Sequence, residues 1–117
     1  MYPVQTDTQA LLAAIKDRIS AQRTVVYATN RPISRIASFC GAGLDEETLA
    51  FAKQQGADVI VSSDAKHHLI AQAVEQGLDV ILLTHYAAEN YGFQLFYQKM
   101  KEKLNVPCEY FTDERFL

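Results

Sequence analysis

The stretch that decides the fold of this chain is DVILLTHYAAE, residues 79–89. Its first five residues, Asp79–Leu83, are mostly large and apolar, which predicts a short buried strand. Residues 84–104 carry apolar and aromatic side chains at helical spacing, which predicts a long helix with most of its aromatic residues in the core. A buried strand that leads straight into a helix is the repeating unit of α/β proteins.

The same alternation extends in both directions from this stretch. From residue 34 onward we expect strands over 34–40, 57–62, 79–84 and 107–112, separated by helices over about 45–55, 64–76 and 84–104. Before it we expect a polar lead over residues 1–8, a helix to about Ser20 capped by Thr6, Asp7 or Thr8, and a strand over 24–29. That strand could pair in a hairpin with the strand over 34–40. The pattern predicts an α/β fold: one domain over residues 1–117, with a mostly parallel sheet and helices packed on its faces.

Composition narrows the class of function. The chain has 117 residues, with 11 Lys and Arg against 14 Asp and Glu, so its net charge is −3. This balance argues against sequence-independent binding to nucleic acid, which requires a basic face. No apolar run approaches the ~20 residues of a membrane span. The start of the chain lacks a secretory signal pattern, and Cys40 and Cys108 are too few for a disulfide framework, so we expect a cytoplasmic protein with two reduced, largely buried thiols.

Chemically reactive residues gather where three predicted strands end. These places are Cys40–Gly43, Ser62–Asp64 and Thr84–Tyr86. Open α/β sheets bind ligands at the carboxyl ends of their strands, so we expect the functional site at this edge.

His85 and Glu89 are the strongest site candidates. They are four residues apart, so at the start of a helix they lie on one face, one turn apart. An imidazole and a carboxylate in this arrangement are typical ligands of a hard or borderline divalent ion. Two side chains do not complete a coordination sphere, and the residues alone also allow a histidine that is simply hydrogen-bonded to a nearby carboxylate.

The other candidates admit structural and functional interpretations. We expect Asp64 to cap the helix that follows it, a role compatible with lining a site. His67 and His68 point about 100° apart on a helix, so they do not share one ion easily. The turn at residues 41–43 could cradle a phosphate, but acidic residues follow it, which favours a tight structural turn. We expect Cys40 beside it to be structural, because no base is evident nearby.

Four segments taken in order, residues 38–43, 56–68, 77–81 and 85–89, resemble a known family. They are similar to the C-terminal half of the Nif-three-like dinuclear metal-centre proteins, also called GTP cyclohydrolase I type 2 homologues, and the resemblance spans residues 34–112. No single motif is specific, but the ordered set is. The chain differs from the family at Ser63 and Thr84, where the family usually has glycine.

The resemblance implies roles for four residues. His85 and Glu89 would bind a divalent metal of the zinc, iron or manganese type, in a centre of one or two ions. Asp64 and His68 would lie beside the site and act as catalytic residues that orient groups or relay protons, and His68 is therefore a better candidate than His67. The remaining metal ligands of the family come from an N-terminal half that the matched residues do not include, so the chain is either an excised domain or a short relative.

Two functions from different classes follow from these observations. The first is a metal-dependent hydrolase domain that acts on a nucleotide-like or phosphorylated small-molecule substrate. The alternative is a non-catalytic oligomerisation or binding domain that lacks the N-terminal half of the metal site. The resemblance implies a homo-oligomer in either case, and the sequence leaves open whether the chain is an enzyme.

Overall fold

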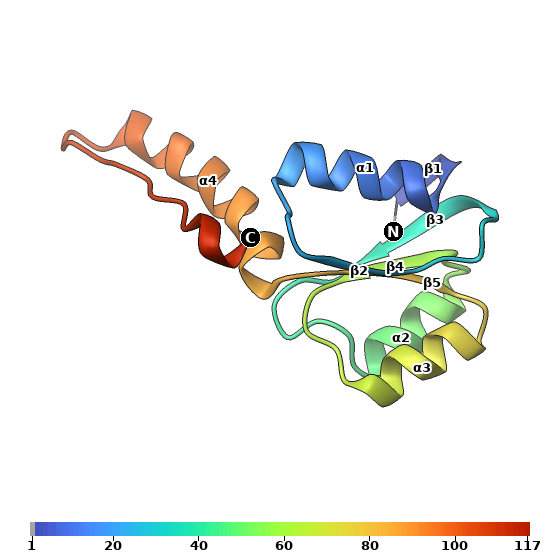
Figure 1. Cartoon of the computed structure of the whole chain (residues 1–117). Helices are drawn as coiled ribbons and strands as arrows, with labels where there is room; N and C mark the ends of the chain where they lie inside the picture. Colours follow the sequence, from blue (N-terminus) through green and yellow to red (C-terminus); the bar gives the residue numbers. More distant parts are fainter. Residues whose placement is uncertain (1) are drawn as a thin grey trace.

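A computed structural model describes residues 2–117, which form one mixed five-stranded sheet with four α-helices (Figure 1). In chain order the elements are β1 (Tyr2–Asp7), α1 (Thr8–Ile19), β2 (Thr24–Tyr27), β3 (Pro32–Ser38), α2 (Glu46–Gln54), β4 (Val59–Ser62), α3 (His67–Glu75), β5 (Asp79–Leu83), α4 (His85–Lys103) and the 3₁₀-helix η1 (Glu114–Phe116). The strand order across the sheet is β1-β3-β4-β5-β2. The predicted α/β class is therefore confirmed.

The centre of the sheet is parallel and its two edges are antiparallel. Strands β3, β4 and β5 run in the same direction, whereas β1 pairs antiparallel with β3 and β2 pairs antiparallel with β5. The expectation of a mostly parallel sheet therefore holds for the three central strands only. Parallel pairing follows from the α2 and α3 crossovers, because parallel neighbours need a connection long enough to return the chain to the same end of the sheet.

Three predicted elements differ in the structure. The predicted polar lead is strand β1, although Met1 lies outside the described residues. Strand β2 does not form a hairpin with β3, because α1 carries the chain across one face to the far edge, where Thr29 donates two hydrogen bonds to Asp79 at the start of β5. Residues 107–112 form no strand, because side chains of α4 rather than a neighbouring strand bind this segment: the Tyr97 hydroxyl donates to the Cys108 carbonyl at 2.9 Å.

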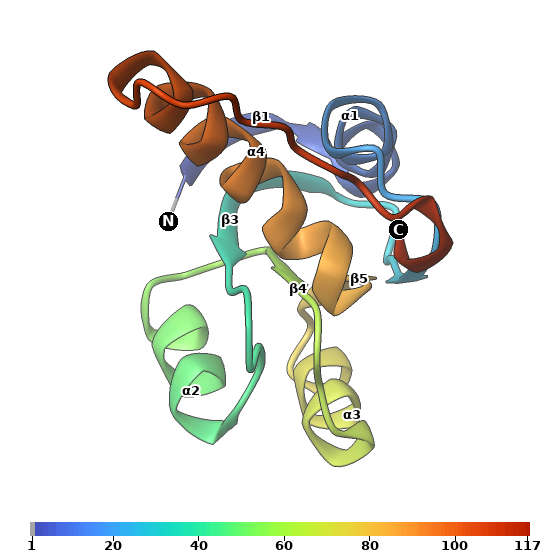
Figure 2. The same ribbon diagram turned by 90° about the vertical axis from the view of Figure 1, so that its left-hand side faces the viewer.

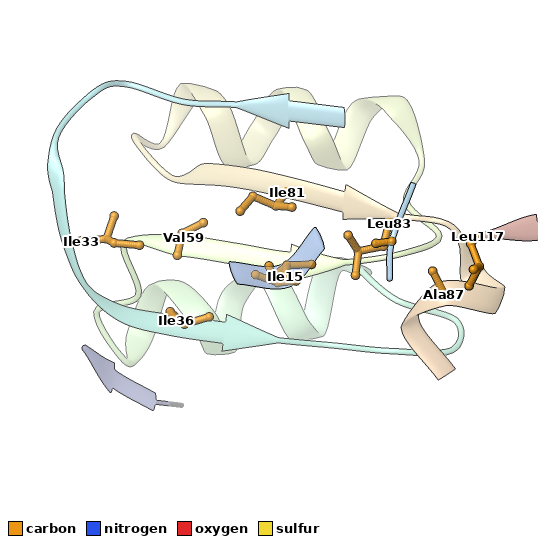
Figure 3. Packing of buried hydrophobic residues seen from close by; sticks show 10 residues of the cluster. Ile15, Ile33, Ile36, Val59, Ile81, Leu83, Ala87 and Leu117 are labelled. Atoms are coloured by element: carbon orange, nitrogen blue, oxygen red, sulfur yellow. The ribbon is translucent and has the colours of Figure 1, made fainter. Parts of the chain in front are cut away.

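Helices cover both faces of the sheet. Helix α1 lies on one face and α2 and α3 on the other, while α4 projects beyond the end of the sheet and the chain returns alongside it (Figures 1 and 2). The alternation of side chains along the strands separates two apolar layers. Val59 and Ile81 pack on the α1 side (Figure 3). Val61 belongs to the same layer, whereas Ile60 and Val80 pack against α2 and α3. Both faces of the central strands are therefore buried, as expected for parallel strands.

Several local predictions can be compared directly with the structure. Asp7 caps α1 by accepting a hydrogen bond from the Ala10 N–H at 2.8 Å, as expected. Cys40 is exposed and Cys108 is half-buried, so the expectation of two largely buried thiols is wrong. Cys40 is exposed because it lies in the turn after β3, outside both apolar layers. No helix within residues 2–117 is both long and apolar enough to cross a membrane.

Candidate metal-binding site

The parallel topology brings the three predicted strand ends together. The carboxyl ends of β3, β4 and β5 lie at one edge of the sheet, and hydrogen bonds tie the segments that follow them. The Ser63 hydroxyl donates to the Gly41 carbonyl at 3.1 Å, and the Leu44 N–H donates to the Asp64 carbonyl at 3.1 Å. The predicted edge of the sheet is therefore where the candidate residues meet.

His85 lies between two carboxylates at this edge. Its Nδ1 is 2.5 Å from Asp64 Oδ2, and its Nε2 is 3.1 Å from Glu89 Oε1. Helix α4 starts at His85 because the Thr84 hydroxyl accepts a hydrogen bond from the Ala87 N–H at 3.0 Å. That start places Glu89 one turn along the same face, as the four-residue spacing predicts.

The two carboxylates change the protonation of His85. The hydrogen bond that the His85 ring donates to Asp64 and the negative charge of Glu89 raise the pKa of His85 above its ordinary value. All three side chains are accessible to solvent, with exposed fractions of 49% for His85, 58% for Asp64 and 37% for Glu89. A cation that binds Nε2 must therefore compete with a proton, and it would do so better as the pH rises through that raised pKa.

The geometry of the pair fits a shared ion. Two donors that each lie about 2.0–2.2 Å from one tetrahedral ion are about 3.3–3.6 Å apart. His85 Nε2 and Glu89 Oε1 are 3.1 Å apart, so a small outward movement of either side chain would admit an ion. The carboxylate on Nδ1 is the usual outer partner of a metal-bound histidine, since it keeps the proton on Nδ1 and leaves Nε2 free. Within residues 2–117, however, no group of three or more His, Cys, Asp and Glu side chains is arranged to hold an ion. The chain thus offers two donors and an orienting carboxylate.

Asp64 does not cap a helix, contrary to the sequence-based expectation. Helix α3 begins at His67, and Lys66 occupies its N-cap position without a side-chain hydrogen bond. The backbone of Asp64 is held by Leu44, so its side chain is free to reach His85. The two residues that separate Asp64 from the helix, Ala65 and Lys66, explain the difference, because a capping side chain must lie directly before the first turn.

His68 lies apart from the His85 cluster. It is exposed near the start of α3, as is His67, and it lines a groove of about 680 Å³ to which Asp64 and the acidic residues 45–47 also contribute. No hydrogen bond or ion pair in the described part of the chain joins His68 to His85 or Glu89. Its catalytic role therefore stays a prediction.

The glycine turn at residues 41–43 has a structural role. Gly43 adopts a φ of +76°, and an added Cβ there would overlap the Asp64 carbonyl oxygen. The Gly43 N–H donates to the Cys40 carbonyl at 3.3 Å, and the next N–H, of Leu44, is used by Asp64. Because these N–H groups are satisfied within the chain, the turn does not offer them to a phosphate, and the tight-turn interpretation is favoured.

A cavity beside the cluster contains residues that sequence reasoning missed. It measures about 480 Å³ and is lined by Arg23, Thr84, His85, Tyr86, Glu89, Arg115 and Phe116. Arg23 is present because β2 runs antiparallel to β5, with Thr24 opposite Leu83, so the residue before β2 lies next to the residue after β5. A hairpin between β2 and β3, as the sequence suggested, would have placed Arg23 elsewhere, and no local pattern in the sequence indicates its approach to His85.

The fold and the site define a class before any relative is considered: an α/β protein that gathers a histidine and two carboxylates at the carboxyl edge of its parallel strands. Comparison with protein-family models matches residues 1–114 to Duf34/NIF3 (NGG1p interacting factor 3). The chain belongs to the Duf34/NIF3 family, as the resemblance in sequence implied.

Curated relatives carry a related name. A GTP cyclohydrolase 1 type 2 homolog from Staphylococcus aureus (strain MSSA476) is 33% identical over 110 residues, which is 90% of this chain and 30% of the relative. One from Methanocaldococcus jannaschii is 32% identical over 72 residues, 62% of this chain and 29% of the relative. The chain therefore spans about 30% of the length of these relatives.

Solved structures share the fold. Reduced HcgD from Methanocaldococcus jannaschii superposes with a TM-score of 0.72 at 26% identity, covering 86% of this chain and 41% of that one. A Staphylococcus aureus hypothetical protein superposes with a TM-score of 0.66 at 29% identity, covering 88% of this chain and 35% of that one. These neighbours support the family assignment from three-dimensional structure.

Proposed function

We propose that His85 and Glu89 bind a divalent ion of the zinc, iron or manganese type, and that the domain forms part of a metal-dependent hydrolase site. The observation that carries the proposal is the 3.1 Å separation of His85 Nε2 and Glu89 Oε1, with Asp64 on the other ring nitrogen. Asp64 fixes the ring orientation and keeps Nδ1 protonated, so that Nε2 faces the ion. Glu89 contributes a negative oxygen ligand.

The reaction class follows from the donor set and from the names of the relatives. A bound divalent ion would supply Lewis-acid activation of water near neutral pH. The name GTP cyclohydrolase 1 type 2 homolog, borne by the relatives, favours a nucleotide-like or phosphorylated substrate. Since the chain provides two donors and spans about 30% of its relatives, we propose that further ligands come from outside residues 2–117, in one centre of one or two ions.

Replacement of Glu89 tests the metal site. We expect Glu89→Gln to weaken zinc binding at least about tenfold, because an amide is a poorer ligand than a carboxylate and no longer draws a cation electrostatically. The matched control is Glu102→Gln, which removes an exposed carboxylate from the same helix away from His85. Zinc affinity is measured by competition with a chromophoric chelator. Equal affinities in the wild type and Glu89→Gln would contradict the proposal.

A second candidate function is assembly, and the projecting helix favours it. Helix α4 and the returning chain expose large apolar side chains far from the sheet, among them Phe93 (59% exposed), Phe96 (57%) and Phe111 (79%). Phe93 and Phe96 were expected in the core, and the projection of α4 beyond the sheet explains why they are not (Figures 1 and 2). Exposed apolar surface of this kind typically marks an interface, so we propose that the chain is a homo-oligomer.

Light scattering tests the assembly proposal. We expect a molar mass above that of the 13.1 kDa chain, and a decrease toward that value when Phe93 and Phe96 are both replaced by Ser. The measurement is repeated with a chelator. A mass that is unaffected by the chelator excludes an ion shared between subunits, and a monomeric wild type contradicts assembly through α4.

A further inference from the structure

We propose that the cavity beside His85 and Glu89 binds the phosphate group of a phosphorylated small molecule through Arg23, with an aromatic portion of that molecule against Phe116. This inference deepens the proposed function and rests on it for the position of the reacting group. Its own evidence lies in the shape, the charges and the walls of the cavity.

The cavity is built from segments that are distant in sequence. Arg23 enters from the start of β2, Thr84 and His85 from the end of β5, and Phe116 from η1. Its volume of about 480 Å³ lies in the range of pockets that hold small molecules, about 300–1,000 Å³. Glu89 also lines it, so a bound molecule would be next to the proposed metal ligands.

The charges in the cavity single out Arg23. Arg115 is neutralised, because its Nε and Nη2 donate to the two carboxylate oxygens of Asp113 at 2.9 and 2.6 Å. Arg23 donates from Nη1 to the Arg115 carbonyl at 2.6 Å, and no carboxylate of the described residues lies within ion-pair distance of it. One edge of its guanidinium is thereby anchored, while its charge and remaining donors are available to an anion.

The aromatic wall is held in place. The Thr84 hydroxyl donates to the Phe116 carbonyl at 2.6 Å, and the Leu117 carbonyl accepts from the Arg23 N–H at 3.2 Å. The Phe116 ring lies 6.2 Å from the Tyr86 ring, centroid to centroid, yet 53% of Phe116 remains exposed. The Arg115 guanidinium lies over this ring, 5.4 Å from its centroid, so a flat aromatic group would use the part of the ring that remains exposed.

A phosphate ester suits this combination better than a neutral ligand. A phosphate monoester carries between one and two negative charges at pH 7 and has three acceptor oxygens. One or two of these oxygens can accept from the Arg23 guanidinium, while another faces the side of the cavity formed by His85 and Glu89. Glu89 is the negatively charged residue that lines the cavity, and a divalent ion on it would offset its repulsion of the ester.

Titration with adenosine monophosphate (AMP) as the probe tests the inference, with inorganic phosphate and adenosine as partial probes. Binding is followed by amide chemical shifts in the presence of zinc. We expect AMP to bind more tightly than either partial probe and to shift residues 84–86 and 116. Arg23→Gln should weaken AMP about tenfold, and Phe116→Ala should weaken AMP while leaving inorganic phosphate unchanged.

Two further variants control the result. Arg18→Gln removes an exposed arginine of α1 outside the cavity and should leave AMP affinity unchanged. Arg23→Lys keeps the positive charge and should retain most of the AMP affinity. This variant distinguishes the loss of the charge from the loss of the hydrogen bond between Arg23 and the Arg115 carbonyl. Equal AMP affinity in the wild type and Arg23→Gln, or shifts confined to residues 41–47, would overturn the inference.

Failure of the proposed function can be recognised separately. Zinc affinity should be the same in Arg23→Gln and the wild type, because Arg23 is not a ligand. If zinc does not bind but AMP, titrated without zinc, still depends on Arg23, the metal proposal fails and the phosphate site stands. If zinc binds through Glu89 but AMP ignores Arg23, the phosphate site alone fails.

Discussion

Gly43→Ala is expected to lower the free energy of unfolding by about 3 kcal/mol. Gly43 has a φ of +76°, and an added Cβ would overlap the Asp64 carbonyl oxygen and come within 2.9 Å of Ser62 Oγ. The overlapped oxygen belongs to the backbone, two residues after the end of β4, so it cannot swing aside as a flexible side chain would. The loop that positions Asp64 must move, and the hydrogen bond that His85 donates to Asp64 is expected to weaken with it.

Gly77→Ala is the matched control for this change. Gly77 also has a positive φ, +83°, but nothing lies within 4 Å of an added Cβ. Gly77→Ala should therefore lower the free energy of unfolding by only about 1 kcal/mol, which is the cost of the backbone strain alone. Urea unfolding of both variants isolates the steric overlap, and equal losses of stability in the two would show that the close approach at Gly43 is not a constraint.

Asp79→Ala is expected to lower the free energy of unfolding by about 3 kcal/mol as well. Asp79 is fully buried at the start of β5 and accepts hydrogen bonds from Thr8 Oγ1 at 2.6 Å, Thr29 N at 3.1 Å and Thr29 Oγ1 at 2.8 Å. Its loss leaves donors without an acceptor inside the protein. These bonds join β5 to the start of α1 and the end of β2, so the edge strand should loosen first.

The control for Asp79 is Asp17→Ala, an exposed carboxylate on α1 that should change stability by less than about 0.5 kcal/mol. Urea unfolding gives the stability change, and amide hydrogen exchange locates it. A loss of protection in β2 that exceeds the loss in β4 is the expected pattern. A stable Asp79→Ala protein with unchanged exchange in β2 would contradict the structural role assigned to these bonds.

The central part of the fold could be predicted because its signals are local. The apolar runs that became β4 and β5, and the glycines after α2 and α3, specify their elements without reference to the rest of the chain. The pairing of β2 could not be predicted in this way. It depends on α1 crossing the sheet and on the hydrogen bonds between Thr29 and Asp79, both of which join distant residues.

The same distinction between local and long-range relations applies to the candidate site. The relation of His85 to Glu89 is a spacing within one helix, so the sequence predicted it. The nearness of Asp64 followed from the parallel strand ends, although its expected capping role did not hold. Arg23 and Phe116 reach the cavity only through the antiparallel edge and the returning chain end, which no local pattern encodes.

The most direct test of the central claim is the nitrogen-15 spectrum of the histidine rings during zinc addition. The chain has three histidines, so each ring can be assigned. The account predicts that the Nε2 signal of His85 changes on zinc binding while its Nδ1 keeps the proton shared with Asp64, and that His67 is unaffected. Zinc that leaves the His85 ring unchanged, or that shifts only the rings of His67 and His68, would contradict the claim.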